Sequence, residues 1–209
     1  MLGKLISFEG PEGSGKTSVI QAVGAHFQSL GHDVLISREP GGIPIAEAIR
    51  NIILDVEHTA LDPMAEAMLF AASRRQHVIE VIEPAIQKGK MVLVDRYIDS
   101  SLAYQGVGRE LGIERIFNLN KMAINGYLPA LTLFIDVHPD EGLKRIAHRQ
   151  DSLDRLDRET VAFHHKVYQG YQELLDKEPQ RIKKVNGQQP MADVARDAIA
   201  LIEHMVKEG

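Results

Sequence analysis

The sequence has no cysteine, no excess of positive charge and no long apolar run, and each absence excludes a class of protein. Without cysteine, neither a disulfide nor a thiolate metal site can form. No apolar run approaches the roughly 20 residues of a membrane-spanning helix, and the N-terminus lacks a signal-peptide pattern. The net charge of −5 argues against a surface that coats nucleic acid. We therefore expect a cytoplasmic protein with neither a membrane nor a nucleic acid as partner.

Apolar runs alternate with helical patterns along the chain, which is typical of an α/β fold with a parallel sheet. The length of 209 residues suits one domain over 1–209, with a short lid at about 149–159. The stretch 96–108 is polar and contains glycine, so we expect a loop there. Strands are predicted at 4–9, 33–38, 91–95, 131–137 and 181–186, and helices at 18–30, 45–54, 63–88, 113–125, 139–148, 160–177 and 191–206.

One stretch fits the motif G-x-x-x-x-G-K-[ST] without a mismatch, between a predicted strand and a predicted helix. Such a loop surrounds phosphates with backbone N–H groups at a helix N-terminus. Lys16 would reach the β- and γ-phosphates of a nucleotide, and the Thr17 hydroxyl would face Mg²⁺. The alternative, a glycine-rich turn that binds nothing, is disfavoured by the complete motif. The predicted phosphate-binding residues are Gly10, Pro11, Glu12, Gly13, Ser14, Gly15, Lys16 and Thr17.

Asp95 ends a buried apolar strand and is the candidate metal partner of Thr17. In parallel sheets, ligands bind at the carboxyl ends of the strands, where Asp95 and the phosphate-binding loop would meet. A carboxylate there holds Mg²⁺ while the ion bridges two phosphates. The alternatives are a helix cap or a salt bridge to Arg96. The intact loop favours the metal site.

Three arginines, Arg50, Arg74 and Arg96, are predicted next to the same edge. A guanidinium binds phosphate through two parallel hydrogen bonds, so converging arginines would indicate a second phosphorylated substrate. Each arginine alone is more often a solvated or paired surface residue, so the binding role depends on their convergence. Arg75 is expected to be exposed, because successive helical residues point in different directions. The histidines show no metal-binding spacing.

The stretch 149–158 is rich in charge and interrupts helical sequence. A solvated surface loop is one interpretation. The other is a mobile lid whose arginine excludes water and neutralises the charge on a transferring phosphoryl group. Because the phosphate-binding loop has no arginine, that charge must come from elsewhere, which favours the lid.

With these residues placed, the chain resembles the bacterial thymidylate kinases along almost its whole length. Two of the matching stretches, REPGG (38–42) followed by DRYIDSSLAYQG (95–106), are specific to that family. The stretch FEGPEGSGKT (8–17) is shared by many kinases. The matching stretches are FEGPEGSGKT (8–17), REPGG (38–42), MLFAASRR (68–75), DRYIDSSLAYQG (95–106) and LDRLD (153–157).

The resemblance implies a P-loop nucleoside monophosphate kinase fold, with a five-stranded parallel sheet flanked by helices and a short lid. It implies an enzyme that phosphorylates dTMP to dTDP with ATP and Mg²⁺ and that forms a homodimer. One branch of the family carries its catalytic arginine in the P-loop and the other in the lid. Gly13 and Ser14 make this chain resemble the lid type. The implied catalytic residues are Lys16, Asp95, Arg96, Arg155 and Arg149, with Arg155 matching the lid pattern best and Arg158 as a further candidate.

The resemblance also implies how the acceptor is bound. Phe70 would stack on thymine, and Arg74 and Gln105 would hydrogen-bond the base. Tyr104 would lie against the sugar and disfavour a 2′-hydroxyl. The other roles are Glu12 on the sugar 3′-hydroxyl, Arg50 and Arg96 on the acceptor phosphate, and Asp95 on Mg²⁺ and the acceptor. The implied substrate-binding residues are Glu12, Glu39, Arg50, Phe70, Arg74, Arg96, Ser100, Ser101, Tyr104 and Gln105.

Three other functions are alternatives to phosphorylation of dTMP. A regulatory GTPase needs the guanine-reading sequence Asn-Lys-x-Asp, but the nearest stretch, 120–123, lacks the aspartate, and the chain contains no Asp-x-x-Gly. Another nucleoside monophosphate kinase, acting on AMP, GMP or a shikimate-like acceptor, is disfavoured only by the resemblance. A non-catalytic nucleotide-binding module is disfavoured by Lys16, Thr17 and Asp95.

Overall fold

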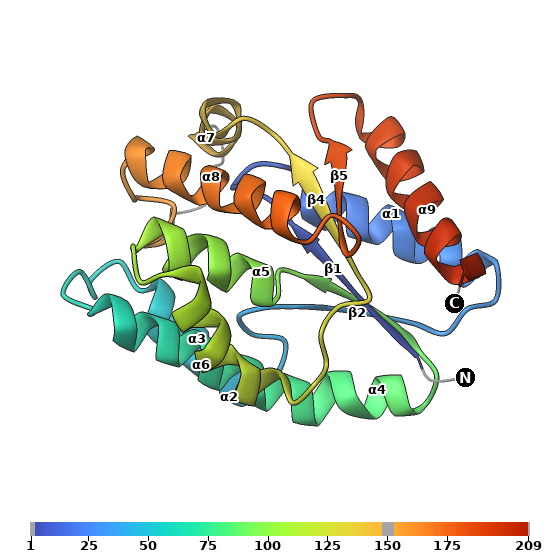
Figure 1. Ribbon diagram of the computed structural model, residues 1–209, viewed down its shortest axis with the longest axis horizontal. Coiled ribbons are helices and arrows are strands. Elements are labelled where there is room, and N and C mark those ends of the chain that lie inside the picture. The colour runs from blue at the N-terminus through green and yellow to red at the C-terminus, as the bar shows by residue number, and fades with distance from the viewer. Residues whose placement is uncertain (1–2, 148–152, 209) are drawn as a thin grey trace.

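The protein, described here by a computed structural model over residues 3–147 and 153–208, contains one five-stranded parallel sheet (Figure 1). The strand order is β2-β3-β1-β4-β5. The central strand β1 lies between β3 and β4, so the loop after β1 emerges in the middle of the carboxyl edge, where ligands bind. The predicted α/β class is confirmed. The strands are β1 (Lys4–Glu9), β2 (Val34–Arg38), β3 (Met91–Asp95), β4 (Leu131–Asp136) and β5 (Ile182–Asn186).

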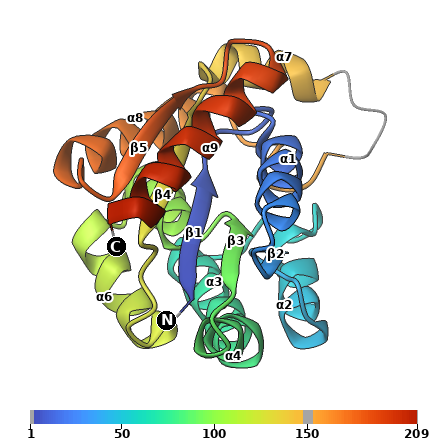
Figure 2. The same cartoon turned by 90° about the vertical axis from the view of Figure 1, so that its right-hand side faces the viewer.

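Helices cover both faces of the sheet, with α1 and α9 on one face and α3, α6 and α8 on the other (Figure 2). The helical segments are α1 (Lys16–Ser29), α2 (Pro44–Leu54), α3 (Pro63–His77), η1 (Val78–Ile82), α4 (Glu83–Gln87), α5 (Ile98–Ser101), η2 (Leu102–Gly108), α6 (Ile113–Ile124), α7 (Pro139–Ala147), α8 (Val161–Lys177) and α9 (Met191–Glu208), of which η1 and η2 are π-helical.

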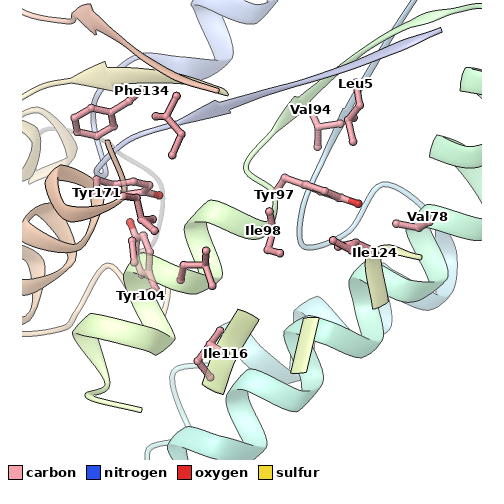
Figure 3. Packing of buried hydrophobic residues seen from close by; sticks show 14 of the residues in the cluster. Leu5, Val78, Val94, Tyr97, Ile98, Tyr104, Ile116, Ile124, Phe134 and Tyr171 are labelled. Carbon is pink, nitrogen blue, oxygen red and sulfur yellow. The ribbon is translucent and has the colours of Figure 1, made fainter. Parts of the chain in front are cut away.

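Side chains of the central strands alternate between two hydrophobic cores. Ile6 packs on the α1 and α9 side, whereas its neighbour Leu5 packs on the opposite side, as the two-residue period of a strand requires. On that second side Phe134 stacks on Tyr171 with 5.1 Å between ring centroids (Figure 3). Tyr104 and Tyr171 lie in this core, and their hydroxyls reach the carboxyl edge of the sheet. The core therefore supports the residues that line that edge.

The prediction of a loop over 96–108 is wrong. Residues 98–108 are helical, first in α5 and then in the π-helical η2. The polar side chains that suggested a loop are buried instead, with Ser101 and Gln105 only 2% and 1% exposed. They are polar because they form hydrogen bonds at the cavity described below. π-Helical turns of this kind are frequent at functional sites.

The helices predicted to begin at 45 and 63 begin at Pro44 and Pro63. Asp62 caps α3 by accepting hydrogen bonds from two backbone N–H groups, and Pro44 occupies the first turn of α2. The helix predicted over 63–88 is continuous, but its middle widens into η1 before Pro84. Proline lacks an N–H and its ring clashes with the preceding turn, so a wider turn relieves both constraints. Among the described residues, no helix is both long and apolar enough to cross a bilayer.

Candidate active site

A cavity of about 920 Å³ opens at the carboxyl edge of the sheet. Its walls come from the loop after β1, the ends of β2 and β3, helices α2 and α3, the segment α5–η2, and the turn around residues 154–156. Residues far apart in the sequence therefore face one space, as predicted. The predicted site residues that line it are Glu12, Thr17, Glu39, Arg50, Phe70, Arg74, Asp95, Arg96, Ser100, Ser101, Tyr104 and Gln105.

The phosphate-binding loop is folded around its own lysine. Lys16 Nζ donates to the carbonyls of Gly10 at 3.1 Å and Pro11 at 3.0 Å, and to Ser14 Oγ at 3.2 Å. Gly15 precedes α1 with φ of 85°, a conformation that a side chain would strain. Burial and the charge of Arg96 lower the pKa of Lys16 to about 8. The phosphate oxygens of a nucleotide can replace these carbonyl and hydroxyl acceptors and thereby favour the charged form of Lys16.

That lowered pKa predicts pH-dependent nucleotide binding. Below pH 8 Lys16 is charged and ready for the phosphates, whereas above it the free protein must take up a proton on binding. We expect the Kd of a nucleoside triphosphate to rise by up to about tenfold per pH unit above 8. Calorimetric titrations between pH 7 and 10 would measure this. A Lys16→Arg variant that binds should show a flat profile, and a flat profile for the unmodified protein would contradict the prediction.

The tip of the loop packs directly against α7. A Cβ on Gly13 would lie 2.3 Å from the carbonyl oxygen of Gly142, and a Cβ on Gly142 would lie 2.2 Å from that of Glu12. Gly13 also has φ of 70°. Arg145, on the same helix, donates to the Gly13 carbonyl at 3.4 Å. The backbone contact leaves no room for an arginine at position 13. The packing of α7 therefore explains why position 13 of the phosphate-binding loop is not an arginine.

Thr17 and Asp95 form the predicted pair. Thr17 Oγ1, in the first turn of α1, donates to Asp95 Oδ2, at the end of β3, at 2.9 Å. The salt-bridge alternative for Asp95 is not observed, because Arg96 is ion-paired with Glu12. No group of three or more His, Asp or Glu side chains in the described part of the chain is arranged to hold a metal. A hydroxyl and one carboxylate nevertheless fit Mg²⁺, which takes one or two protein oxygens and completes its shell with water and phosphates.

Arg96 is held in place by several hydrogen bonds next to the phosphate-binding loop. Its φ of 66° is unusual for a residue with a side chain, and places the guanidinium against the loop. It donates to Glu12, to the Gly10 carbonyl at 3.1 Å, and to Ser100 Oγ and Tyr171 Oη at 3.3 Å each. Burial disfavours its charge, but the Glu12 carboxylate outweighs burial and raises the pKa of Arg96. The cation is therefore preorganised for an anion.

The Glu12 carboxylate is correspondingly held ionised. Burial raises its pKa, but the charges of Arg96 and Lys16 outweigh this and lower the pKa of Glu12 to about 2. Tyr104 donates its hydroxyl to Glu12 Oε1 at 3.1 Å. An ionised carboxylate only accepts hydrogen bonds, so Glu12 can receive one from a ligand hydroxyl.

Comparison with known protein families shows which family the chain belongs to. A model described as thymidylate kinase matches residues 8–198. The chain belongs to the thymidylate kinase family. It is 51% identical over 204 residues to the thymidylate kinase of Limosilactobacillus fermentum, covering 97% of this chain and 95% of that protein. It is 47% identical over 209 residues to the thymidylate kinase of Bacillus licheniformis, covering 100% and 99%.

A solved structure supports the same fold. The crystal structure of thymidylate kinase from Ehrlichia chaffeensis matches with a TM-score of 0.78 and 28% identity, covering 97% of this chain and 99% of that one. The resemblance read from the five sequence stretches is thereby confirmed, and so is the P-loop nucleoside monophosphate kinase fold with its five-stranded parallel sheet.

Arg74 lines the cavity, but its guanidinium already donates several hydrogen bonds to neighbouring residues. It is 2% exposed. Nε donates to Glu39 at 2.7 Å, Nη1 donates to Ser101 at 3.0 Å and to Asn120, and Nη2 donates to the Tyr97 carbonyl at 2.9 Å. Four of its five N–H groups are thus used by the described residues, which leaves one on Nη2. Glu39, predicted as a substrate residue, is 4% exposed and holds Arg74 in place.

The position of Asn120 argues against the regulatory GTPase alternative. It lies fully buried in α6, accepts from Arg74, and donates to the Ile116 carbonyl at 2.9 Å. It is therefore unavailable to read a guanine. The sequence similarity of 120–123 to a guanine-binding motif is a coincidence of two adjacent helical residues.

Arg155, the lid arginine that matched the family pattern best, is partly buried and donates to Glu66 at 2.6 Å and to the Ile53 carbonyl at 2.7 Å. Its neighbour Leu156 packs in one cluster with Phe70. Arg155 and Leu156 are thus packed against the rest of the protein, whereas Arg158 is exposed. Arg149 lies outside the described residues.

Three buried polar residues of the site were not found from the sequence. They are Glu9, Glu66 and Asn120, each fully buried. Glu9 accepts from the Tyr97 N–H at 2.8 Å and from Ser100, while burial and the charge of Asp99 raise the pKa of Glu9 to about 7. A charged residue at the end of an apolar strand was the available signal. Glu66 and Asn120 lie in helical sequence, where nothing local marks them.

Proposed function

We propose that this protein transfers the γ-phosphoryl group of ATP to dTMP, giving dTDP and ADP, with Mg²⁺ as cofactor. One observation carries the proposal beyond family membership. Arg96, the cation suited to an acceptor phosphate, donates to the Gly10 carbonyl of the donor loop at 3.1 Å. Donor and acceptor phosphates bound at these two groups would be neighbours, and positioning is the main demand of phosphoryl transfer.

The reaction needs no strong base. A phosphate oxygen of dTMP forms the new bond to the γ-phosphorus, and the bond to the bridging oxygen of ADP breaks. Because the attacking oxygen is already ionised, no proton has to be removed. Lys16 and the loop N–H groups hold the donor phosphates, and Arg96 with Arg50 holds the acceptor phosphate. Thr17 and Asp95 would hold Mg²⁺, which would supply further positive charge to the phosphates.

The acceptor nucleoside would extend away from the P-loop. Phe70, which lines the cavity, offers its ring for stacking on the base. Tyr104 lies beneath Arg96, whose guanidinium carbon is 5.0 Å from the ring centroid, and would contact the sugar. The ionised Glu12 would accept a hydrogen bond from the 3′-hydroxyl. Ser100 and Ser101 complete the wall between phosphate and base.

We further propose a homodimer in the cytoplasm. Met122 on α6 is 78% exposed and Met68 on α3 is 54% exposed. These two helices pack against each other, and each carries an exposed methionine. A second copy of the chain would cover these methionines. The cytoplasm is the compartment in which a bacterial enzyme meets both ATP and dTMP.

An acceptor panel tests the proposed function. Purified protein with ATP and Mg²⁺ would be presented separately with dTMP, dUMP, dCMP, AMP, GMP and shikimate, and ADP release would be measured. We expect dTMP to give the highest kcat/KM. A higher value with AMP, GMP or shikimate would mean a different acceptor kinase, whereas GTP hydrolysis without any acceptor would favour a regulatory NTPase.

A further inference from the structure

One buried carboxylate lies behind the base end of the cavity. Glu66 on α3 is fully buried and accepts four hydrogen bonds. Oε1 accepts from Gln105 Nε2 at 2.9 Å and from Arg109 Nε at 3.3 Å, and Oε2 accepts from Arg109 Nη2 at 3.0 Å and from Arg155 Nη2 at 2.6 Å. Both oxygens are fully used. Burial of such a group is tolerated only when it is paired in this way.

The charge state of Glu66 decides the orientation of Gln105. Burial raises the pKa of Glu66, but hydrogen bonds from Arg109, Gln105 and Arg155 outweigh burial and lower it. The carboxylate is therefore ionised and can only accept hydrogen bonds. The amide of Gln105 must turn its NH₂ group to Glu66. Its carbonyl Oε1 accepts no hydrogen bond from the described residues, and Gln105 lines the cavity.

We propose that Glu66 is a positioning residue that sets the base specificity of the acceptor site, by fixing Gln105 with its carbonyl oxygen toward the base. This inference rests on the proposed function, and it names the class of base. An outward carbonyl accepts a hydrogen bond from a ring N–H. Thymine and uracil carry that N–H at N3, whereas the N3 of cytosine is itself an acceptor and would face the carbonyl without a hydrogen.

The neighbouring Arg74 supplies the complementary group. Its remaining Nη2 hydrogen is a donor on the same wall, because Glu39, Ser101, Asn120 and Tyr97 hold the other four. A donor beside an acceptor matches the O4 and N3–H of thymine. Cytosine presents the opposite arrangement: its amino group is a donor where thymine has the acceptor O4, and its N3 is an acceptor where thymine has a donor. A site whose buried polar groups would be left unpaired rejects such a base strongly.

The test is a Glu66→Gln variant assayed with dTMP and dCMP. Glutamine at position 66 offers both an amide N–H and a carbonyl, so Gln105 can turn either way. We expect kcat/KM for dTMP to fall about tenfold, mainly through KM, and the dTMP-over-dCMP preference to fall by about tenfold or more. An unchanged preference would overturn the inference. If the unmodified protein does not use dTMP, it is the proposed function that fails.

A matched variant separates positioning from support of the fold. Arg109→Met removes two hydrogen bonds from the same carboxylate but leaves the contact between Glu66 and Gln105. We expect this variant to lower the melting temperature and to retain the base preference. A loss of preference equal to that of Glu66→Gln would overturn the inference, because the effect would then follow from a loosened cluster.

A double-mutant cycle keeps the inference testable if Glu66→Gln folds poorly. Gln105→Met removes the amide and leaves Glu66 to its two arginines. We expect it to reduce the dTMP-over-dCMP preference by at least as much as Glu66→Gln, and adding Glu66→Gln to it should change the preference no further. Additive losses, or an unchanged preference in Gln105→Met, would contradict a role for Glu66 through Gln105.

Discussion

Replacing Arg149 with alanine is expected to lower kcat by about a thousandfold or more, with a smaller effect on KM. Phosphoryl transfer spreads negative charge over three oxygens, and an arginine directed at them acts mainly in the transition state. Gly13 and Ser14 supply no such charge, and the packing of α7 leaves no room for an arginine at position 13. We propose that Arg149 provides it, and single-turnover measurements with saturating ATP and dTMP would separate chemistry from binding.

The matched variant for this experiment is Arg155→Ala. Arg155 is bound by Glu66 and the Ile53 carbonyl, so we expect its loss to weaken dTMP binding and stability more than the chemical step. The kcat of this variant should stay within about tenfold of the unmodified protein. A thousandfold loss in Arg155→Ala with a few-fold loss in Arg149→Ala would reverse the two roles. It would also mean that Arg155 leaves Glu66 when both substrates are bound.

Replacing Asp95 with asparagine is expected to lower kcat by about a hundredfold to a thousandfold. The isosteric amide keeps an oxygen near Thr17 but removes the negative charge that attracts Mg²⁺. The half-saturating Mg²⁺ concentration should rise along with the loss of rate, which a titration of activity against Mg²⁺ would measure. A rate that falls only slightly at every Mg²⁺ concentration would contradict a metal-binding role.

Asp136 provides the control for Asp95. It also ends a strand of the sheet, β4, but it pairs with Lys184 and accepts from Tyr168 at 2.8 Å rather than meeting Thr17. Asp136→Asn should leave the Mg²⁺ dependence unchanged, although it can lower thermal stability. An equal shift in both variants would show that the effect comes from the charge of the sheet edge and not from one metal ligand.

Apart from the family resemblance, the residues of the sequence predicted the parts of the site that have short-range geometry. The P-loop, its Thr17 and the helix after it are specified by eight consecutive residues, because the turn, the helix N-terminus and the lysine follow from local backbone preferences. Asp62 and Pro44 favour helix starts for the same reason. Asp95 was found because a carboxylate after an apolar strand has a fixed place in a parallel sheet.

Segment 98–108 shows where such reasoning failed. Serine, glutamine and glycine argue for a loop when only their intrinsic preferences are considered. In the folded protein Ser101 and Gln105 instead have partners on other elements, Arg74 and Glu66, so the helix becomes favourable. Tertiary hydrogen bonds therefore decided the secondary structure there.

By itself the sequence determined a P-loop in an α/β fold, because the loop chemistry needs only neighbours in the chain, and the resemblance of its five stretches added the kinase family. Only the tertiary structure decided how each side chain is used. Glu66 and Arg155 are separated by 89 positions, and Glu9 and Tyr171 by 162, so no local pattern could pair them. Burial makes these pairs necessary, since a buried charge without a partner would destabilise the fold. The same constraint pairs Arg155 with Glu66.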